Sequence, residues 1–269
     1  NLGSDDEDKA FGQFVTGCQI TAKRGINLWS VAGSDVSDFT ASNNRFNLLS
    51  GGISDTSIAF STAYYGGVIG NVTFINNEVF NYSTTETTTL GISISNVNNL
   101  IATGNKFHKL SKAVMAIQTP YIEFYNIAYN EIYEWAYHTT AYSAGTAGIY
   151  LDLQLDAEGG NLVLKGNTMI AGSGNEHYGI LVYAPNLMLT QITGNDIIGV
   201  TGVSITTITP VSYITDEIVF IDHNSDSDFP FGAVWGIQAC DGSTWTVMSN
   251  GSTYRVDGGA WKKVAWTYV

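Results

Sequence analysis

A segment of about thirty residues recurs along this chain, and this repeat constrains the fold more than any other feature. Each copy contains a short stretch of alternating apolar residues that ends near an asparagine, as in Asn71–Phe80 and Asn161–Met169. The asparagines are Asn44, Asn77, Asn105, Asn130, Asn167, Asn195 and Asn224, spaced 33, 28, 25, 37, 28 and 29 residues apart. A period of this size is typical of a solenoid, in which each repeat buries its apolar face only against its neighbours.

A second strand-like stretch lies between successive asparagines and usually begins with glycine and a β-branched residue. The clear copies are Gly25-Ile26, Gly91-Ile92, Gly148-Ile149, Gly179-Ile180, Gly202-Val203 and Gly236-Ile237. The copy at Ala113-Val114 lacks the glycine, and the copy near Ile53–Phe60 is blurred. Two strand types at a fixed phase favour stacked coils over the alternative, an antiparallel sandwich with Asn-rich hairpins. Asparagine suits the corner because it tolerates a left-handed φ, and aligned asparagines form side-chain ladders.

The composition excludes several other classes of protein. The 269 residues include 29 Gly and 4 Pro, only 13% are charged, and strand and turn formers replace helix formers. A helical bundle, a coiled coil and collagen are therefore excluded, and no apolar run reaches the roughly 18–20 residues of a membrane span. The net charge is −13, and residues 113–254 contain 14 acidic residues against one basic residue. We therefore expect no nucleic-acid partner and no membrane insertion.

The two ends of the chain depart from the repeat. Residues 1–10 are rich in acids and predict a leader segment, and residues 11–238 contain the coils. Residues 239–269 read as antiparallel hairpins with Asn-Gly and Asp-Gly turns and contain Trp245, Trp261 and Trp266. Because a solenoid needs its open ends covered, we expect this tail to be a C-terminal β cap or a trimerisation element.

The pattern from Phe14 to Gln238 resembles the right-handed parallel β-helix of the pectate-lyase-like superfamily. The expected fold is all-β: a single-stranded solenoid of about 7–8 coils with a small C-terminal antiparallel cap. With its cap, the chain is most similar to a bacteriophage tailspike or tail-fibre domain. That resemblance implies a homotrimer that is assembled in the host cytoplasm, resides in the virion tail and contacts a bacterial surface polysaccharide outside the cell. Two unpaired cysteines, Cys18 and Cys240, fit assembly in a reducing cytosol.

One strand of the repeat carries candidate chemistry. The segment Gly148–Asp156 alternates between apolar and polar residues. We expect Ile149 and every second residue after it to face inward, and Tyr150, Asp152 and Asp156 to face outward in one row. In the next coil Ile180 aligns with Ile149, which places Tyr183 beside Asp152.

The longest insertion of the repeat, from Tyr133 to Ala147, comes directly before this strand. It supplies Glu134, Trp135, Tyr137 and His138, and carboxylates beside exposed aromatic rings are suited to sugars. Two carboxylates also suffice to hydrolyse a glycosidic bond. The predicted catalytic residues are Asp152, Glu134 and Asp156, and the predicted sugar-binding residues are Trp135, Tyr137, His138, Tyr150 and Tyr183.

Two other functions remain open at this point. The same residues suit a non-catalytic receptor-binding or structural spike, in which the acids are solvated and the rings cover the shaft. A polysaccharide lyase or epimerase is the third alternative, but it needs a cation to neutralise a uronate. We expect no cofactor and no metal site. A Ca²⁺ ion bound by Asp222, Asp226 and Asp228 is a minor alternative.

Overall fold

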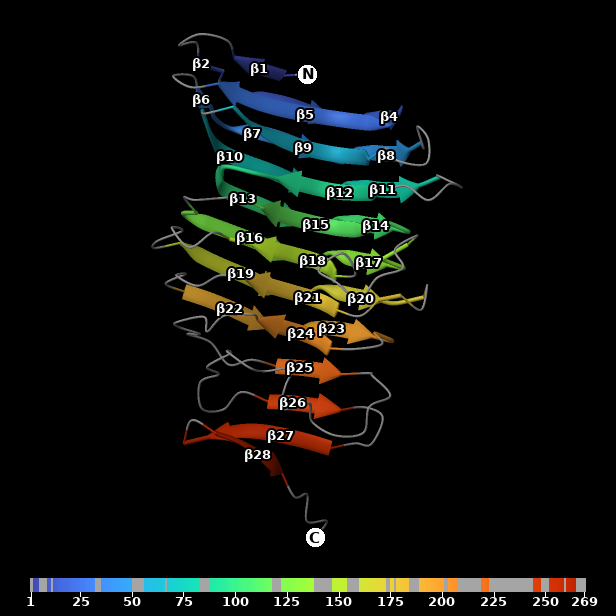
Figure 1. The fold of residues 1–269 in the computed structure, drawn as a ribbon, viewed down its shortest axis with the longest axis vertical. Coiled ribbons are helices and arrows are strands. Elements are labelled where there is room, and N and C mark those ends of the chain that lie inside the picture. Colours follow the sequence, from blue (N-terminus) through green and yellow to red (C-terminus); the bar gives the residue numbers. More distant parts are fainter. Residues whose placement is uncertain are drawn as a thin grey trace.

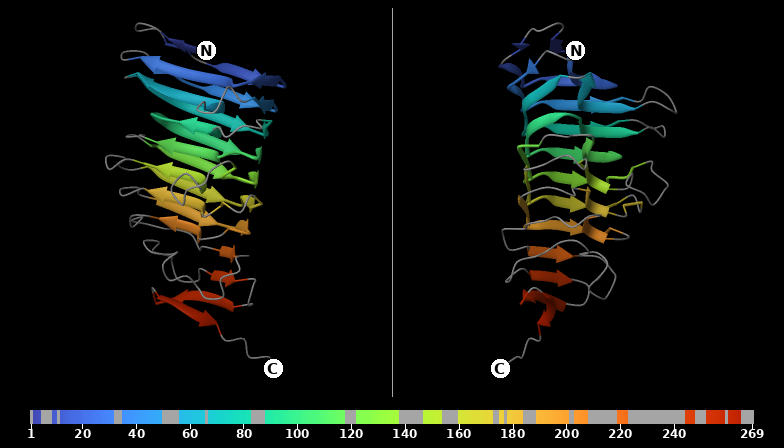
Figure 2. Two further views of the ribbon diagram at one scale, coloured as in Figure 1. Left: turned by 45° about the vertical axis from the view of Figure 1, so that its right-hand side comes forward. Right: turned by 60° about the vertical axis from the view of Figure 1, so that its left-hand side comes forward.

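The computed structural model shows a stack of parallel strands that runs from the N-terminus to the C-terminus (Figure 1). It describes residues 2–4, 9–10, 12–31, 35–49, 56–65, 67–82, 88–117, 122–137, 147–153, 160–172, 175–176, 178–183, 189–200, 203–207, 219–222, 244–247, 252–258 and 260–264. The predicted parallel β-helix is confirmed, and Figure 2 shows the coils stacked on one another in two further views.

The strands form three sheets. Sheet A contains β1 (Leu2–Ser4), β5 (Arg24–Val31), β9 (Ser57–Tyr65), β12 (Thr89–Ile94), β15 (Lys112–Ile117), β18 (Ala147–Asp152), β21 (Tyr178–Tyr183) and β24 (Val203–Thr207). Sheet B contains β2 (Lys9–Ala10), β3 (Gln13–Thr16), β6 (Asp35–Val36), β7 (Phe39–Ser42), β10 (Val68–Ile75), β13 (Val97–Thr103), β16 (Phe124–Ala128), β19 (Asn161–Lys165) and β22 (Leu189–Thr193). Sheet C contains β4 (Gln19–Ala22), β8 (Arg45–Leu48), β11 (Glu78–Asn81), β14 (Lys106–His108), β17 (Glu131–Tyr133), β20 (Thr168–Ile170), β23 (Asn195–Ile198), β25 (Val219–Asp222), β26 (Thr244–Val247), β27 (Ser252–Asp257) and β28 (Ala260–Val264).

From β1 to β23 each coil passes from sheet A to sheet B and then to sheet C, so the described coils use three kinds of strand where the sequence pattern predicted two. The Gly-Ile stretches form sheet A, and the stretches before the asparagines form sheet B. The residues after the asparagines form the strands of sheet C, several of which have only three or four residues. An alternation this short was not recognisable as a strand in the sequence.

Equivalent side chains of successive coils stack in rows because neighbouring strands pair in parallel without slipping. On sheet C, Phe46, Val79, Phe107 and Ile132 are paired in register and all point into the buried interior. Aromatic rings fill the upper coils, where the centroids of Phe46 and Phe74 lie 5.7 Å apart. This continuous core buries the inner face that a single coil would leave exposed.

The Gly-Ile motif reflects a close approach between sheets A and C. A Cβ at Gly91 would lie 2.6 Å from the ring of Phe107 and would press on the carbonyl oxygen of Ala113. Glycine at this position therefore allows an aromatic side chain of sheet C to pack against the backbone of sheet A.

The predicted asparagine ladder is present at the corner between sheets B and C. The Oδ1 of Asn105 accepts hydrogen bonds from the backbone N of Asn77 (2.9 Å) and from its Nδ2 (3.2 Å). The Nδ2 of Asn105 donates to the carbonyl oxygen of Phe74 (2.8 Å) and to Oδ1 of Asn130 (3.0 Å). The same pattern links Asn44, Asn77, Asn105, Asn130, Asn167 and Asn195, all of which are buried. Both donors and the acceptor of each interior amide are therefore satisfied without water.

The residue with the left-handed φ at this corner is the one before the ladder asparagine. The expectation that the ladder asparagine itself adopts this conformation is therefore wrong. Asn43, Asn76 and Tyr129 have φ of 55°, 53° and 56°, and glycines take this position in other coils. The ladder asparagine is present because its amide bonds along the stack, and the preceding residue makes the bend.

The ladder ends at different residues on its two sides. At its N-terminal end Cys18, an exposed free thiol, takes the ladder position, and its backbone N donates to Oδ1 of Asn44 (2.9 Å). At its C-terminal end β25 pairs with β23 so that Phe220 lies opposite Asn195. Asn224 lies outside the described residues, and this register contradicts its prediction as the seventh ladder residue, because β25 continues sheet C and not sheet B.

The C-terminal strands combine both kinds of pairing. Strand β26 adds to β25 in parallel, whereas β27 pairs antiparallel with β26 and β28 pairs antiparallel with β27. The predicted Asp-Gly turn joins the last two strands, with Asp257 opposite Ala260 and a φ of 64° at Gly258. The antiparallel element predicted for residues 239–269 is therefore present at the end of sheet C.

Removing one rung tests the ladder. Replacing Asn105 by alanine should lower the free energy of unfolding by about 2–6 kcal/mol, because it leaves the N–H of Asn77 and the C=O of Phe74 buried without partners. Urea unfolding followed by circular dichroism measures the change. The control is Asn71→Ala, since Asn71 is exposed and makes a surface hydrogen bond to Asp38. Equal losses in the two variants would contradict the role of the ladder.

Extending the ladder should have the opposite effect. An asparagine at position 18 can donate its Nδ2 to Oδ1 of Asn44, as Asn77 does to Asn105. We expect Cys18→Asn to raise the free energy of unfolding by about 0.5–1.5 kcal/mol. Cys18→Ala, which removes the thiol without adding an amide, should give no such gain. A stability of Cys18→Asn equal to that of Cys18→Ala would show that the ladder cannot be extended at this end.

Candidate functional site

Strand β18 of sheet A carries a hydroxyl–carboxylate pair on its outer face. Ile149 and Leu151 are fully buried, and the alternate residues Tyr150 and Asp152 are half-buried, as the sequence predicted. The Oη of Tyr150 donates a hydrogen bond to Oδ2 of Asp152 at 3.2 Å. Burial and the neighbouring carboxylate raise the pKa of Tyr150, so its hydroxyl stays protonated and available as a donor.

The neighbouring strands place further candidates around this pair. Asp152 is paired in register with Tyr183 of β21, as predicted from the alignment of Ile149 with Ile180. The side chain of Tyr183 lies outside the described part of the structure. On the other side, Met115 of β15 is paired with Tyr150.

Lys112 is a member of this cluster that the sequence analysis missed. Its Nζ lies 5.9 Å from the centroid of the Tyr150 ring, a cation–π contact. Burial lowers the pKa of the Lys112 ammonium, and no described carboxylate forms an ion pair with it. The sequence could have revealed Lys112 through the alignment of Val114 with Ile149. This alignment places Lys112 in the preceding coil, beside the start of β18.

Glu134 and Tyr137 lie at the corner between sheets C and A and share one cation. The Nζ of Lys109 is 3.6 Å from Oε2 of Glu134 and 5.7 Å from the centroid of the Tyr137 ring. Glu134 follows β17 with a left-handed φ of 53°, as Lys109 follows β14 with a φ of 58°. The start of the long insertion therefore repeats the corner of the preceding coil.

Trp135 is fully buried, so the prediction that it presents an exposed ring to a sugar is wrong. Its Nε1 donates to the carbonyl oxygen of Tyr178 (2.8 Å), and its ring packs against Gly148. Trp135 is buried because of its place in the corner between sheets C and A. At this corner the second residue after a strand of sheet C points inward. Leu110 and Val200 take the same position in their coils and are also buried.

A buried carboxylate that the sequence analysis did not single out lies next to Glu134. Glu176 is fully buried, and its Oε1 accepts a hydrogen bond from the backbone N of Gly172 at 2.9 Å. A Cβ at Gly172 would lie 2.7 Å from Cγ of Glu134, so the side chains of Glu134 and Glu176 flank this glycine.

Several predicted residues lie outside the described part of the chain. His138 and Asp156 are among them, as are two of the three aspartates considered for Ca²⁺, Asp226 and Asp228. Within the described residues, no group of three or more His, Cys, Asp or Glu side chains is arranged to hold a metal ion. No helix in that same part of the chain has the length and hydropathy needed to cross a membrane.

The outer face of sheet C carries a second cluster, which is a ladder of charges. Arg45, Glu78, Lys106 and Glu131 follow one another in register, so their signs alternate from coil to coil. Nζ of Lys106 is 3.2 Å from Oε2 of Glu131, and a nitrogen of Arg45 is 3.9 Å from Glu78.

Glu131 shows how strongly these groups interact. Burial alone would raise the pKa of Glu131, but hydrogen bonds from Tyr133 and Lys106 outweigh it and lower that pKa. Exposed pairs of this kind contribute at most about 1 kcal/mol each.

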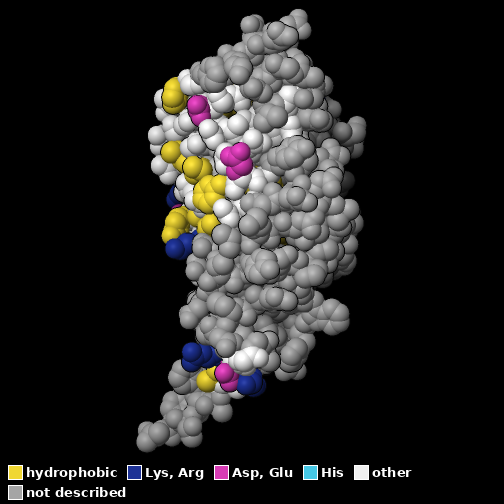
Figure 3. Space-filling view, turned by 90° about the vertical axis from the view of Figure 1, so that its left-hand side faces the viewer, with side chains coloured by type: hydrophobic (Ala, Val, Ile, Leu, Met, Phe, Trp, Pro, Cys, Tyr) yellow, Lys and Arg dark blue, Asp and Glu magenta, His cyan; other side chains and the backbone are white. Residues whose placement is uncertain are grey.

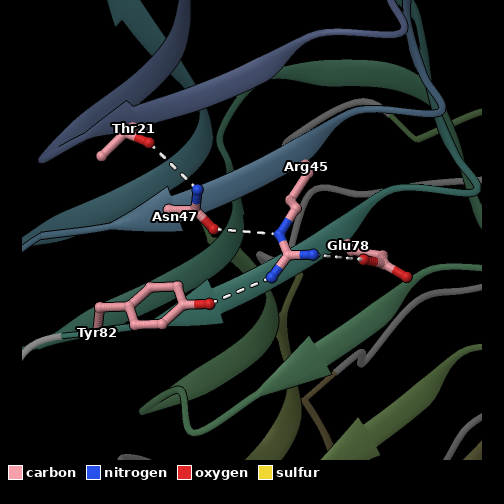
Figure 4. A network of polar contacts seen from close by, with 5 residues as sticks. All are labelled: Thr21, Arg45, Asn47, Glu78 and Tyr82. Atoms are coloured by element: carbon pink, nitrogen blue, oxygen red, sulfur yellow. Dashed lines mark hydrogen bonds and ion pairs between the residues drawn. The ribbon is translucent and has the colours of Figure 1, made fainter.

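Hydrogen bonds extend this ladder at its N-terminal end (Figure 4). Arg45 donates to Oδ1 of Asn47 (3.4 Å) and to Oη of Tyr82 (3.2 Å), and Asn47 in turn donates to Oγ1 of Thr21 (3.1 Å). The groups of this cluster thus use their hydrogen-bonding capacity on one another, which is the behaviour of a stabilising surface and not of an open binding site.

A row of stacked rings runs beside the charges. His108 lies between Phe80 and Tyr133, with centroid distances of 4.4 Å and 5.0 Å and interplanar angles of 5° and 14°. Both faces of the His108 ring are therefore covered and are not available for stacking on a sugar. Burial lowers the pKa of His108 below its ordinary value of 6.5, despite the nearby carboxylates Glu78 and Glu131.

Comparisons with known proteins add no family to this description. No family model matches the chain, and searches of curated proteins and of solved structures returned no significant match.

The stacked histidine predicts a pH dependence of stability. The pKa of His108 is lower in the folded state than in the unfolded chain, so the unfolded chain binds the proton more readily. The free energy of unfolding should therefore decrease as the pH falls from 7.5 through 6.5 toward the folded pKa. Chemical unfolding at a series of pH values down to 5.5 stays above the range in which Glu131 titrates.

The matched variant is His108→Phe, which keeps a ring between Phe80 and Tyr133 and cannot titrate. It should have a flatter dependence over this range. The same slope in both proteins would assign the dependence to a group other than His108.

Proposed function

We propose that this protein is a tailspike-like phage tail protein that binds a bacterial surface polysaccharide on the outer face of sheet A, around Tyr150 and Asp152. In this proposal three chains associate side by side in the virion tail, after assembly in the host cytoplasm, and act outside the cell. The resemblance of the capped solenoid to the pectate-lyase-like superfamily supports the class, and the cluster on β18 supports the site.

The observation that carries the proposal is the Tyr150–Asp152 hydrogen bond at 3.2 Å on an outward, half-buried strand position. Sugar hydroxyls bind to such pairs because the carboxylate accepts and the phenol donates, and the ring adds an apolar face. Lys112 and Met115 border the pair on one side and Tyr183 on the other. The two connections that flank β18 in the chain run through residues 134–146 and 153–160, and inserted segments of solenoids tend to carry function.

Hydrolysis is the catalytic form of this proposal, with Asp152 as one carboxylate and Glu134 or Asp156 as the other. A hydrolase needs one protonated carboxyl group as general acid. Glu134 forms an ion pair with Lys109, and Asp152 accepts a hydrogen bond from Tyr150, so each carboxylate already has a partner within the protein. This observation favours binding without cleavage as the second candidate function.

A lyase or epimerase is supported by one residue. Lys112 supplies beside Tyr150 a positive charge of the kind that could neutralise a uronate. Product analysis separates the three functions, since hydrolysis releases reducing ends, a lyase also produces an unsaturated sugar that absorbs in the ultraviolet, and a binding module produces neither.

Two substitutions test the site on a panel of capsular and O-antigen polysaccharides. If the protein hydrolyses its glycan, Asp152→Asn should lower turnover by about a hundredfold or more while binding persists, because one acid–base group supplies that much. If it only binds, Tyr150→Ala should cost roughly 1–3 kcal/mol of affinity, as at other aromatic platforms. Reducing-end assays and calorimetry measure the two effects.

The control is Asp38→Asn, which changes an exposed aspartate on sheet B that is hydrogen-bonded to Asn71. Its binding and turnover should equal those of the unmodified protein. If Asp152→Asn and Tyr150→Ala also bind and cleave normally, the site lies elsewhere on the molecule.

A further inference from the structure

Lys112 brings a positive charge to the Tyr150–Asp152 pair on sheet A. Its Nζ lies 5.9 Å from the centroid of the Tyr150 ring, and the hydroxyl of the same side chain donates to Oδ2 of Asp152 at 3.2 Å. Tyr150 therefore contacts a cation through its ring and a carboxylate through its hydroxyl. A ligand bound over this side chain meets both charges.

The ammonium of Lys112 has no counter-charge within the part of the chain that the structure describes. The two lysines that precede it are both paired, since Nζ of Lys106 is 3.2 Å from Oε2 of Glu131. Nζ of Lys109 is likewise 3.6 Å from Oε2 of Glu134. Lys112 forms no such ion pair with a described carboxylate, and it is half-buried, which lowers the pKa of its ammonium. The ammonium has thus lost part of its hydration without an anion among the described residues to compensate.

We infer that Lys112 binds a carboxylate of the ligand, so that the polysaccharide recognised at this site is acidic. The inference rests on the glycan binding in the proposed function, and it names the substrate class and the residue that selects it. A neutral sugar placed over Tyr150 would remove more water from the ammonium of Lys112 and would provide no opposite charge. A carboxylate accepts charge-assisted hydrogen bonds from the ammonium, and its negative charge would raise the pKa of Lys112 again.

The two charges also orient the ligand. A sugar carboxylate is attracted by Lys112 and repelled by Asp152, so the acidic group lies on the Lys112 side and neutral hydroxyl groups face Asp152. Lys112 belongs to β15 and Asp152 to β18, which are neighbouring strands of sheet A. The bound glycan therefore crosses from one coil to the next.

The charge of the remaining surface limits how acidic the glycan can be. Residues 113–254 contain 14 acidic residues against one basic residue. Figure 3 shows single acids among uncharged side chains on the side of sheet B, so the negative charge is spread over the surface. A polymer with a carboxylate on every sugar would be repelled by this surface, because one lysine compensates one charge. A repeat unit with one carboxylate among neutral sugars fits the site better.

Carboxyl reduction of the glycan tests the inference without any change to the protein. This reaction converts each acidic sugar to its neutral alcohol form and leaves the backbone of the polymer in place. Each capsular or O-antigen polysaccharide of the panel that binds is measured by calorimetry before and after reduction. We expect the bound polysaccharides to be acidic and to lose about 10- to 100-fold in affinity on reduction, as for other hydrogen bonds to a charged group. Panel members that carry uronic acid or sialic acid distinguish the two sources of the carboxylate.

Variants assign the effect to Lys112. Lys112→Met keeps an unbranched chain beside the Tyr150 ring and removes the charge, so it should bind the acidic polymer as weakly as the unmodified protein binds the reduced one. Lys112→Arg keeps the charge and should keep the preference for the acidic polymer. The control is Lys263→Met, which removes a similar cation–π contact at an exposed lysine, with Nζ 5.8 Å from the centroid of the Tyr254 ring. It should bind as the unmodified protein does. Circular dichroism shows whether each variant is folded, and the comparison of the two polymers stands even if Lys112→Met does not fold.

The outcomes separate this inference from the proposed function. A polysaccharide that binds equally well before and after reduction, and whose binding is lost in Tyr150→Ala, would overturn the inference and leave the glycan site standing. Equal affinities of folded Lys112→Met and Lys263→Met for the acidic polymer would do the same. Tighter binding of alginate, which has a carboxylate on every sugar, than of a polymer with isolated carboxylates would overturn the assigned charge density. A folded protein that binds no member of the panel would overturn the proposed function, and with it the ligand assigned to Lys112.

Discussion

The amide ladder at the corner between sheets B and C sets the geometry of the rest of the molecule. Each interior asparagine places its Oδ1 within reach of both the backbone N and the Nδ2 of the asparagine one coil earlier, as between Asn77 and Asn105. An inserted residue would move the amide away from its partners and leave buried donors unpaired, so this corner keeps a constant length. The spacing between ladder residues still varies from 25 to 37, and the variation falls on the other two corners.

This division explains why the candidate site lies where it does. The connection between β17 and β18 and the connection between β18 and β19 are both long, and they flank the one described strand whose outer positions pair a phenol with a carboxylate. In the three preceding coils the positions that correspond to Tyr150 are Ser61, Ser93 and Met115, none of which is a phenol. The ladder holds β18 in register while the connections beside it are free to change, which is the arrangement that lets a rigid scaffold carry a variable site.

The parts of the fold that could be predicted from the sequence are those in which one residue type recurs at the same position of every repeat. The asparagines marked the ladder, and the Gly-Ile pairs fixed the register that places Tyr183 beside Asp152. The short parallel strands of sheet C, such as β14 and β17, were missed because three or four residues are too few for a recognisable alternation. Trp135 was misjudged because aromatic composition does not reveal direction, although Leu110, two residues after its own strand, carried that information. Lys112 was missed because its proximity to Tyr150 depends on how a long side chain lies across two coils.

The three outer faces also divide the properties of the surface among themselves. Sheet C satisfies its charges and rings internally, with Lys106 paired to Glu131 and His108 stacked between two rings. The described outward positions of sheet B from β7 to β16 carry hydroxyl, amide, aliphatic or aromatic side chains and no charged ones. The Tyr150–Asp152 pair lies on sheet A, which neither of these surfaces includes. The candidate site on sheet A therefore shares no residue with the charge ladder or the stacked rings of sheet C.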